Sequence, residues 1–184
     1  MDVIRRENTV LTVVDMQERL LNAFADKRRA SVIRHAGIAA QAAGVLGIPT
    51  LATEQYPQGL GPTVAEIRER MGAGFAPIEK LAFSCGRSPE FRAALQATGR
   101  RDVLICGVEA HVCVLQTVMD LVREGYRAYV LADAVGSRRD LDWQRGLALM
   151  ERAGAIVGTT ELFLFQLLER AGTDEFRQVS KLVK

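Results

Sequence analysis

The sequence has little of what would assign it to a specialised class of protein. Its longest apolar runs fall far short of the roughly 20 residues that a helix needs to cross a bilayer. Basic and acidic residues nearly balance, at 24 and 22, and are interspersed, which gives no electrostatic argument for nucleic acid or an anionic membrane as a partner. What is left is an ordinary globular protein of 184 residues, long enough to bury a core without metal or disulfide support.

Cysteine is scarce as well. The three cysteines are odd in number and lack the spacing of a disulfide framework, so we expect free thiols in a reducing compartment. No early segment combines a basic start, an apolar stretch and a small-residue cleavage site. The expected location is therefore the cytoplasm.

Short apolar runs alternate with longer amphipathic stretches along the whole chain. Mostly apolar runs such as 9–14 and 102–106 are typical of strands in a sheet that is covered on both faces. We therefore expect one domain over residues 1–184, a three-layer α/β/α sandwich with a Rossmann-like, mainly parallel sheet of about six strands. The other expected strands are 49–53, 75–83, 127–131 and 155–158. Helices are expected over 27–46, 63–70, 89–98, 111–123, 141–152, 161–170 and 174–184.

Three chemically useful residues lie where strands of this sheet end, which is where ligands bind in such folds. Asp15 directly follows the first strand, Lys80 lies in or just after the third, and Cys113 lies in the first turn of the helix after the fourth. A helix N-terminus and a nearby ammonium both lower the pKa of a thiol, and a carboxylate can accept its proton. The three residues together favour a nucleophilic thiol with its own base.

Each of these residues also has a structural interpretation. An aspartate that closes a strand is often a turn residue or helix cap, an isolated lysine is usually exposed, and a free cysteine is more often packed inside than reactive. Only the combination favours catalysis. Cys106, inside a strand, is expected in the core, whereas Cys85, in the loop after Lys80, could face the site as a second pocket thiol or a redox thiol.

Three segments together resemble the isochorismatase-like cysteine hydrolase superfamily. They read VVDMQ at 13–17, EK at 79–80 and GVEAHVC at 107–113, and the resemblance extends from about residue 8 to 170. The loops TEQYP at 53–57 and GLGP at 59–62 resemble the corresponding sequences of the branch called isochorismatase domain-containing proteins. The resemblance also suggests a homo-oligomer.

The resemblance implies a role for each residue. Asp15 would be the base, Lys80 its partner and Cys113 the nucleophile of a hydrolase that acts, without metal or cofactor, on a small amide or related acyl compound. It also implies a cis peptide bond between Val108 and Glu109. That bond would turn the backbone N–H of Glu109 toward that of Cys113, so that the two form an oxyanion hole. The side chain at 109 would then be free to vary.

Two departures from the superfamily narrow this interpretation. Metal-binding nicotinamidases carry an aspartate and two histidines in the loop after the second strand, whereas residues 53–58 here read TEQYPQ. The chain has only two histidines, His35 and His111, so no metal is expected there. Members that cleave the vinyl ether of isochorismate lack the cysteine, and the presence of Cys113 therefore argues against that activity.

Other residues near this sheet edge are candidates for the wall of a substrate pocket. His111 and Cys113 are two apart and would point to different faces of a helix, which argues against a Cys–His pair. The segment from Asp133 to Arg138 follows the fifth strand and could either cap the structure or touch substrate. Two other functions stay open, a catalytically silent regulatory or interaction protein and a thiol redox sensor that uses Cys85 and Cys113. The pocket candidates are Gln17, Glu54, Tyr56, Phe83, His111 and Trp143.

Overall fold

The computed structural model describes residues 3–184, so the first two residues of the expected domain lie outside it. Within these residues, six strands form one sheet in the order β3-β2-β1-β4-β5-β6, and every neighbouring pair is parallel. The predicted α/β architecture is therefore confirmed. The strands are β1 (Thr9–Val14), β2 (Thr50–Gln55), β3 (Ile78–Lys80), β4 (Asp102–Val108), β5 (Arg127–Gly136) and β6 (Ile156–Gly158).

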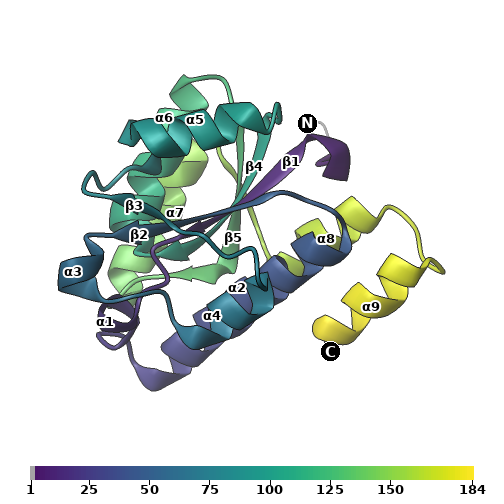
Figure 1. Ribbon diagram of the computed structural model, residues 1–184, viewed down its shortest axis with the longest axis horizontal. Helices are drawn as coiled ribbons and strands as arrows, with labels where there is room; N and C mark the ends of the chain where they lie inside the picture. Colours follow the sequence, from purple (N-terminus) through teal and green to yellow (C-terminus); the bar gives the residue numbers. More distant parts are fainter. Residues whose placement is uncertain (1–2) are drawn as a thin grey trace.

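Helices cover both faces of this sheet (Figure 1). One face carries α2 (Asp26–Val45), α4 (Ala65–Met71), α8 (Thr160–Leu168) and α9 (Asp174–Leu182). The other face carries α5 (Pro89–Ala97), α6 (Leu115–Arg123) and α7 (Asp140–Arg152). Short turns lie outside these layers, namely η1 (Arg6–Asn8), α1 (Glu18–Leu21), α3 (Pro57–Leu60) and η2 (Cys85–Arg87). Over residues 3–184, no helix combines the length and the apolar character that crossing a membrane requires.

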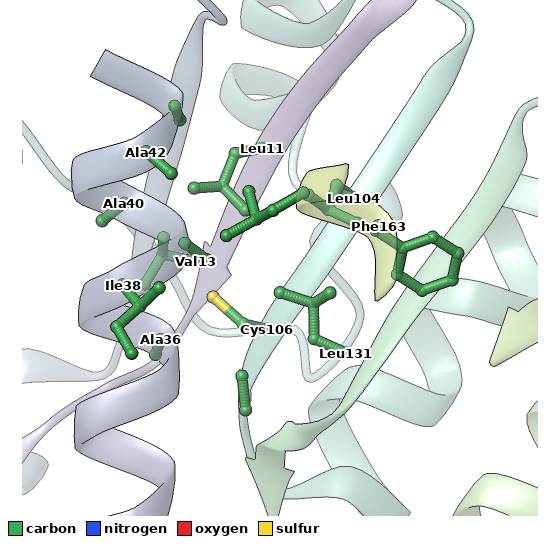
Figure 2. Packing of buried hydrophobic residues seen from close by; sticks show 14 of the residues in the cluster. Leu11, Val13, Ala36, Ile38, Ala40, Ala42, Leu104, Cys106, Leu131 and Phe163 are labelled. Carbon is green, nitrogen blue, oxygen red and sulfur yellow. The ribbon is translucent and has the colours of Figure 1, made fainter. Parts of the chain in front are cut away.

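The central strands divide their side chains between two hydrophobic cores. All residues of β1 and β4 are buried, and successive side chains of a strand point to opposite faces. Leu11 and Val13 pack on the α2 side, whereas Val10 and Val14 pack against the α5–α7 layer. Figure 2 shows Leu11 and Val13 with Cys106, which is completely buried and belongs to the core as the sequence predicted.

Several strands extend further toward the functional edge than their apolar runs indicate. β2 continues to Gln55, which pairs with Lys80 of β3, and β4 continues to Val108, which pairs with Gly136 of β5. These residues are strand because a parallel neighbour supplies hydrogen bonds, a cause that the composition of the run does not reveal. The third strand, expected over 75–83, is limited to Ile78–Lys80.

A glycine allows the ends of β1 and β4 to approach each other. Gly107 has φ of 122°, and a Cβ built there would lie 2.0 Å from the carbonyl oxygen of Val14. Any other residue would collide with the β1 backbone and adopt a φ that L-residues rarely tolerate. Glycine therefore keeps the segment after β4 close to Asp15, the residue that follows β1.

Candidate active site

Asp15 and Lys80 form a buried ion pair at the carboxyl ends of β1 and β3. The Nζ atom of Lys80 lies 2.7 Å from Oδ2 of Asp15, and both side chains are fully buried. The backbone of Asp15 has φ of 49°, a left-handed conformation that aspartate tolerates better than most residues. Its N–H donates to the carbonyl of Thr53 on β2 at 3.1 Å. The chain thus turns at the end of β1 and places the carboxylate beside its neighbouring strands.

The carboxylate of Asp15 has two further neighbours. Its Oδ1 accepts a hydrogen bond from the hydroxyl of Thr53 at 2.7 Å. The thiol of Cys113, 98 positions further along the chain, lies near enough for the charges of Asp15 and Lys80 to act on its pKa. Asp15, Lys80 and Cys113 therefore meet at one edge of the sheet.

The Cys113 thiol is protonated in this environment. Burial is the main cause that raises its pKa above the ordinary 9.0, and the negative charge of Asp15 adds to the increase, whereas Lys80 opposes it. This corrects the expectation that a helix N-terminus and an ammonium lower the pKa of this thiol. Desolvation outweighs the effect of Lys80, because the side chain is almost completely covered. The resting side chain is therefore a neutral thiol, not a standing thiolate.

Lys80 has a full set of hydrogen-bond acceptors. Besides Asp15, its Nζ donates to Oε1 of Gln55 at 2.8 Å and to the carbonyl of Phe83 at 2.9 Å, with the carbonyl of Ala82 further away at 3.3 Å. An ammonium carries three protons, so these partners use all of them. Lys80 acts on the site through its charge and its hold on Asp15.

Cys113 lies in a wide turn that precedes α6. The helix expected from His111 begins as a π-helical turn, η3 (Ala110–Val114), in which the N–H groups of Val112 and Val114 both donate to the carbonyl of Glu109. The peptide bond between Val108 and Glu109 is cis. Single π-helical turns occur frequently at functional sites because they redirect a side chain within a helix. Here the π-helical turn includes the cysteine.

The segment after β5 holds this turn from outside. The Oε1 atom of Glu109 accepts hydrogen bonds from the backbone N–H and the Nε of Arg138, at 3.1 and 3.0 Å. The Nδ1 atom of His111 lies 2.9 Å from the hydroxyl of Ser137. The side chain at 109, which the sequence interpretation left free to vary, is therefore bound. Asp133, which the sequence placed after the fifth strand, lies inside β5 because this strand continues to Gly136, and it caps α8 by accepting from the N–H of Thr160 at 2.9 Å.

Cys85 lies close to the same centre and is completely buried. Its sulfur is 3.7 Å from the hydroxyl of Thr53, and its N–H donates to the hydroxyl of Thr117 at 2.9 Å. That hydroxyl donates in turn to the carbonyl of Cys113 at 2.7 Å. Burial and the charge of Asp15 raise the pKa of Cys85 to about 11. All three cysteines are free thiols.

Two polar pocket candidates are engaged in holding loops. The Oε1 of Gln17 accepts from the N–H of Gln55 at 2.7 Å, and its Nε2 donates to the carbonyls of Gln55 and Gly61, at 3.0 and 2.6 Å. The Oε1 of Glu54 accepts from both the N–H and the hydroxyl of Thr63, each at 2.7 Å. Contact of Gln17 and Glu54 with substrate stays a prediction.

The aromatic candidates lie in different places. Tyr56 and Phe83 flank the ends of β2 and β3, where about half of each side chain is exposed. Trp143 lies apart from them, in a cavity of about 650 Å³ between α2 and α7 whose lining includes neither the ion pair nor Cys113. Within residues 3–184, no group of three or more His, Cys, Asp or Glu side chains is arranged to hold a metal ion.

Sequence reasoning missed Thr53 and Gln55, which contact the ion pair directly. Both lie on β2, two positions apart, so their side chains point to the same face of the sheet. Gln55 escaped notice because the second strand was expected to end at Thr53. The signal that could have found them is β2 itself, since it lies between β1 and β3 and must face both charged residues.

An all-parallel six-stranded sheet flanked by helices, with an aspartate–lysine pair at its carboxyl edge, has the isochorismatase fold. The chain belongs to the isochorismatase domain family, whose model matches residues 9–162. The resemblance predicted from the three sequence segments is therefore confirmed.

Individual relatives cover nearly the whole chain. Isochorismatase domain-containing protein 2 of Homo sapiens is 36% identical over 178 residues, which are 96% of this chain and 83% of that protein. A Caenorhabditis elegans structure described as MAR1 ribonuclease has a TM-score of 0.91 and 36% identity, over 98% of this chain and 91% of that one. Escherichia coli YcaC, described as an octameric hydrolase of unknown specificity, has a TM-score of 0.89 over 97% of this chain and 89% of its own, and at 22% identity it shows likeness of fold alone.

Proposed function

We propose that this protein is a metal-independent cysteine hydrolase that cleaves a small amide or related acyl compound through a thioester on Cys113. The observation that carries the proposal is the buried ion pair of Asp15 and Lys80, joined at 2.7 Å, whose two charges act on the thiol of Cys113. A thiol beside a base and a cation has the parts that nucleophilic catalysis needs. Membership of the isochorismatase domain family supports the hydrolase class.

Acylation begins with proton transfer from Cys113 to Asp15. Because burial keeps the thiol protonated, the thiolate forms as its sulfur attacks the carbonyl carbon of the substrate. The C–S bond forms while the carbonyl π electrons move to oxygen, and the backbone N–H groups of Glu109 and Cys113 stabilise that oxyanion. The intermediate then collapses, the C–N bond breaks, and the amine leaves with the proton that Asp15 returns.

Deacylation uses the same carboxylate a second time. Asp15 takes a proton from water, whose oxygen attacks the thioester carbonyl to form a second tetrahedral intermediate. The C–S bond breaks, the acid product leaves, and the thiolate takes the proton back from Asp15. Throughout the cycle Nζ of Lys80, 2.7 Å from Oδ2 of Asp15, holds the carboxyl group in place beside the thiol.

A substrate screen on matched variants tests the proposal. Wild type, Cys113→Ala and Cys106→Ala are assayed on primary amides, N-carbamoyl compounds and small esters, with release of amine or alcohol as the readout. We expect Cys113→Ala to lose more than about a thousandfold in kcat and Cys106→Ala, the same substitution at a cysteine of the core, to keep most of its activity. Full turnover by Cys113→Ala on any substrate found would refute the proposal.

Cleavage of RNA is the second candidate, because the C. elegans structure of 36% identity is described as a ribonuclease. Single-stranded RNA therefore belongs in the same screen. Cleavage that persists in Cys113→Ala would favour this candidate over the thioester mechanism. The predicted homo-oligomer is checked on the same preparations by light scattering.

A further inference from the structure

We propose that Gln55 is a positioning residue, whose amide holds the ammonium of Lys80 in place without adding charge beside Asp15. The inference deepens the proposed function, because it says how the partner of the base is held. It stands on the contacts of Gln55 itself, which no sequence motif singled out.

The amide of Gln55 can be oriented in only one way. Its Oε1 accepts from Nζ of Lys80 at 2.8 Å, and its Nε2 donates to the carbonyl of Leu81 at 2.8 Å. An ammonium only donates and a carbonyl only accepts, so reversing the amide would break both hydrogen bonds. The side chain is also almost completely buried, which makes an unpaired amide costly. The acceptor for Lys80 is therefore fixed.

The backbone of Gln55 is fixed as well. The amide of Gln17 binds both the N–H and the carbonyl of Gln55, at 2.7 and 3.0 Å. Gln17 is two residues after Asp15, so this contact ties the end of β1 to the end of β2. The position of Asp15 is thus fixed relative to Gln55, the residue whose side chain accepts from Lys80. This assigns to Gln17 the task of supporting Gln55.

The neutrality of Gln55 determines the charge of the site. With the Gln55 amide and the Phe83 carbonyl taking two protons of the ammonium, only one proton of Lys80 goes to a carboxylate. Asp15 and Lys80 therefore form a pair with no net charge. A glutamate at 55 has the same length but would place a second carboxylate against the ammonium. That excess negative charge would disfavour the thiolate of Cys113.

Few other charged groups act on Cys113. The groups from packed elements that act on its thiol are Asp15 after β1, Lys80 of β3 and Cys85 of η2. On its own turn, Glu109 is bound to Arg138 and His111 to Ser137. A change of charge at position 55 therefore reaches the thiol through the Asp15–Lys80 pair.

Alkylation of Cys113 by iodoacetamide between pH 7 and 10, followed by peptide mass spectrometry, tests the inference. We expect Gln55→Glu to lower the rate constant about tenfold at each pH, because the thiolate fraction falls. Gln55→Met removes the acceptor that holds Lys80 but adds no charge, so its rate constant should fall by less than that of Gln55→Glu. Gln58→Glu makes the same charge change on an exposed side chain and serves as the control. Cys106 reports loss of the fold in every sample, since it reacts only when the core opens.

A double-mutant cycle tests the same inference without requiring Gln55→Glu to be stable on its own. Asp15→Asn leaves Lys80 with no carboxylate, and a glutamate at 55 would then replace the missing charge. We expect Gln55→Glu to lower Tm in the wild-type background and to raise it in the Asp15→Asn background. A structural role for the amide would lower Tm in both.

The inference is overturned if Gln55→Glu alkylates at the rate of Gln58→Glu, if Gln55→Met slows as much as Gln55→Glu, or if Tm falls in both backgrounds. None of these measurements needs turnover. Failure of the substrate screen would therefore count against the proposed function, and failure here would count against the role of Gln55.

Discussion

Glu109, which directly precedes the π-helical turn of Cys113, makes two hydrogen bonds with Arg138, 29 residues further along the chain. One carboxylate oxygen of Glu109 accepts both the backbone N–H and the Nε of Arg138, at 3.1 and 3.0 Å. The carboxylate is nearly buried, whereas 58% of the Arg138 side chain is exposed. The hydrogen bond from the backbone N–H of Arg138 is therefore better shielded from water than the one from its exposed side chain.

Removing the Glu109 carboxylate should destabilise the protein more than removing the arginine. Glu109→Ala leaves the N–H of Arg138 without its partner, and we expect the free energy of unfolding to fall by about 1–3 kcal/mol. Arg138→Met breaks only an exposed ion pair, which is worth about 0–1 kcal/mol. Urea unfolding of both variants checks this. Equal losses would mean that the ion pair, not the backbone bond, holds the turn.

Gly107 should be replaceable by no other residue. Alanine there would bring a Cβ to 2.0 Å from the backbone of Val14, so we expect loss of soluble folded protein or of more than about 3 kcal/mol. Gly99→Ala is the matched control, since Gly99 also has a positive φ, of 66°, but has open space around its Cβ position. Its cost should be limited to about 1 kcal/mol of backbone strain. Similar urea midpoints for the two variants would contradict the close contact of β1 and β4.

The buried thiols should make the protein less stable at alkaline pH. Unfolded Cys85 loses its proton near pH 9.0, whereas the folded thiol keeps it until about pH 11. The stabilisation due to this raised pKa is complete below pH 9 and is lost as the pH rises to about 11, at on the order of 1 kcal/mol per pH unit.

Cys85→Ala removes this thiol from the titration. The slope of unfolding free energy against pH between 9 and 11 should therefore be shallower in the variant than in wild type. The difference should correspond to about one proton fewer released on unfolding. Urea unfolding across that range measures the slope. An unchanged slope would show that Cys85 titrates equally in the folded and unfolded states.

The redox alternative for the same thiols has its own test. Cys85 and Cys113 are joined through the hydroxyl of Thr117, which contacts the N–H of one and the carbonyl of the other. If they act as a redox pair, peroxide should convert both thiols to a disulfide with loss of two protons and reduction of peroxide to water. We expect no such disulfide by non-reducing peptide mapping, because both thiols are buried and protonated. Its rapid formation would favour a sensor.

Much of the fold could be predicted from the sequence, because alternating apolar and amphipathic segments determine a covered parallel sheet. The convergence of Asp15, Lys80 and Cys113 on one sheet edge was expected from the rule that ligands lie at the carboxyl ends of strands. What could not be predicted depends on contacts between distant segments. The lengths of β2 and β4 depend on pairing with neighbours, which also placed Gln55 beyond the expected strand end.

The pKa of Cys113 was predicted in the wrong direction for a related reason. Sequence indicates which charges are near a thiol but not how completely the folded chain excludes water from it. Here the α5–α7 layer buries the thiol, and the desolvation that results exceeds the effect of Lys80.

The most direct test of the account is to trap the acyl intermediate. Wild type is mixed with an amide or ester that it turns over, quenched in acid within the first turnover, and examined by intact and peptide mass spectrometry. We predict an added acyl mass on the peptide that contains Cys113, absent from Cys113→Ala and removed by hydroxylamine. Turnover without any adduct, or an adduct that maps to Cys85, would contradict the thioester mechanism on Cys113.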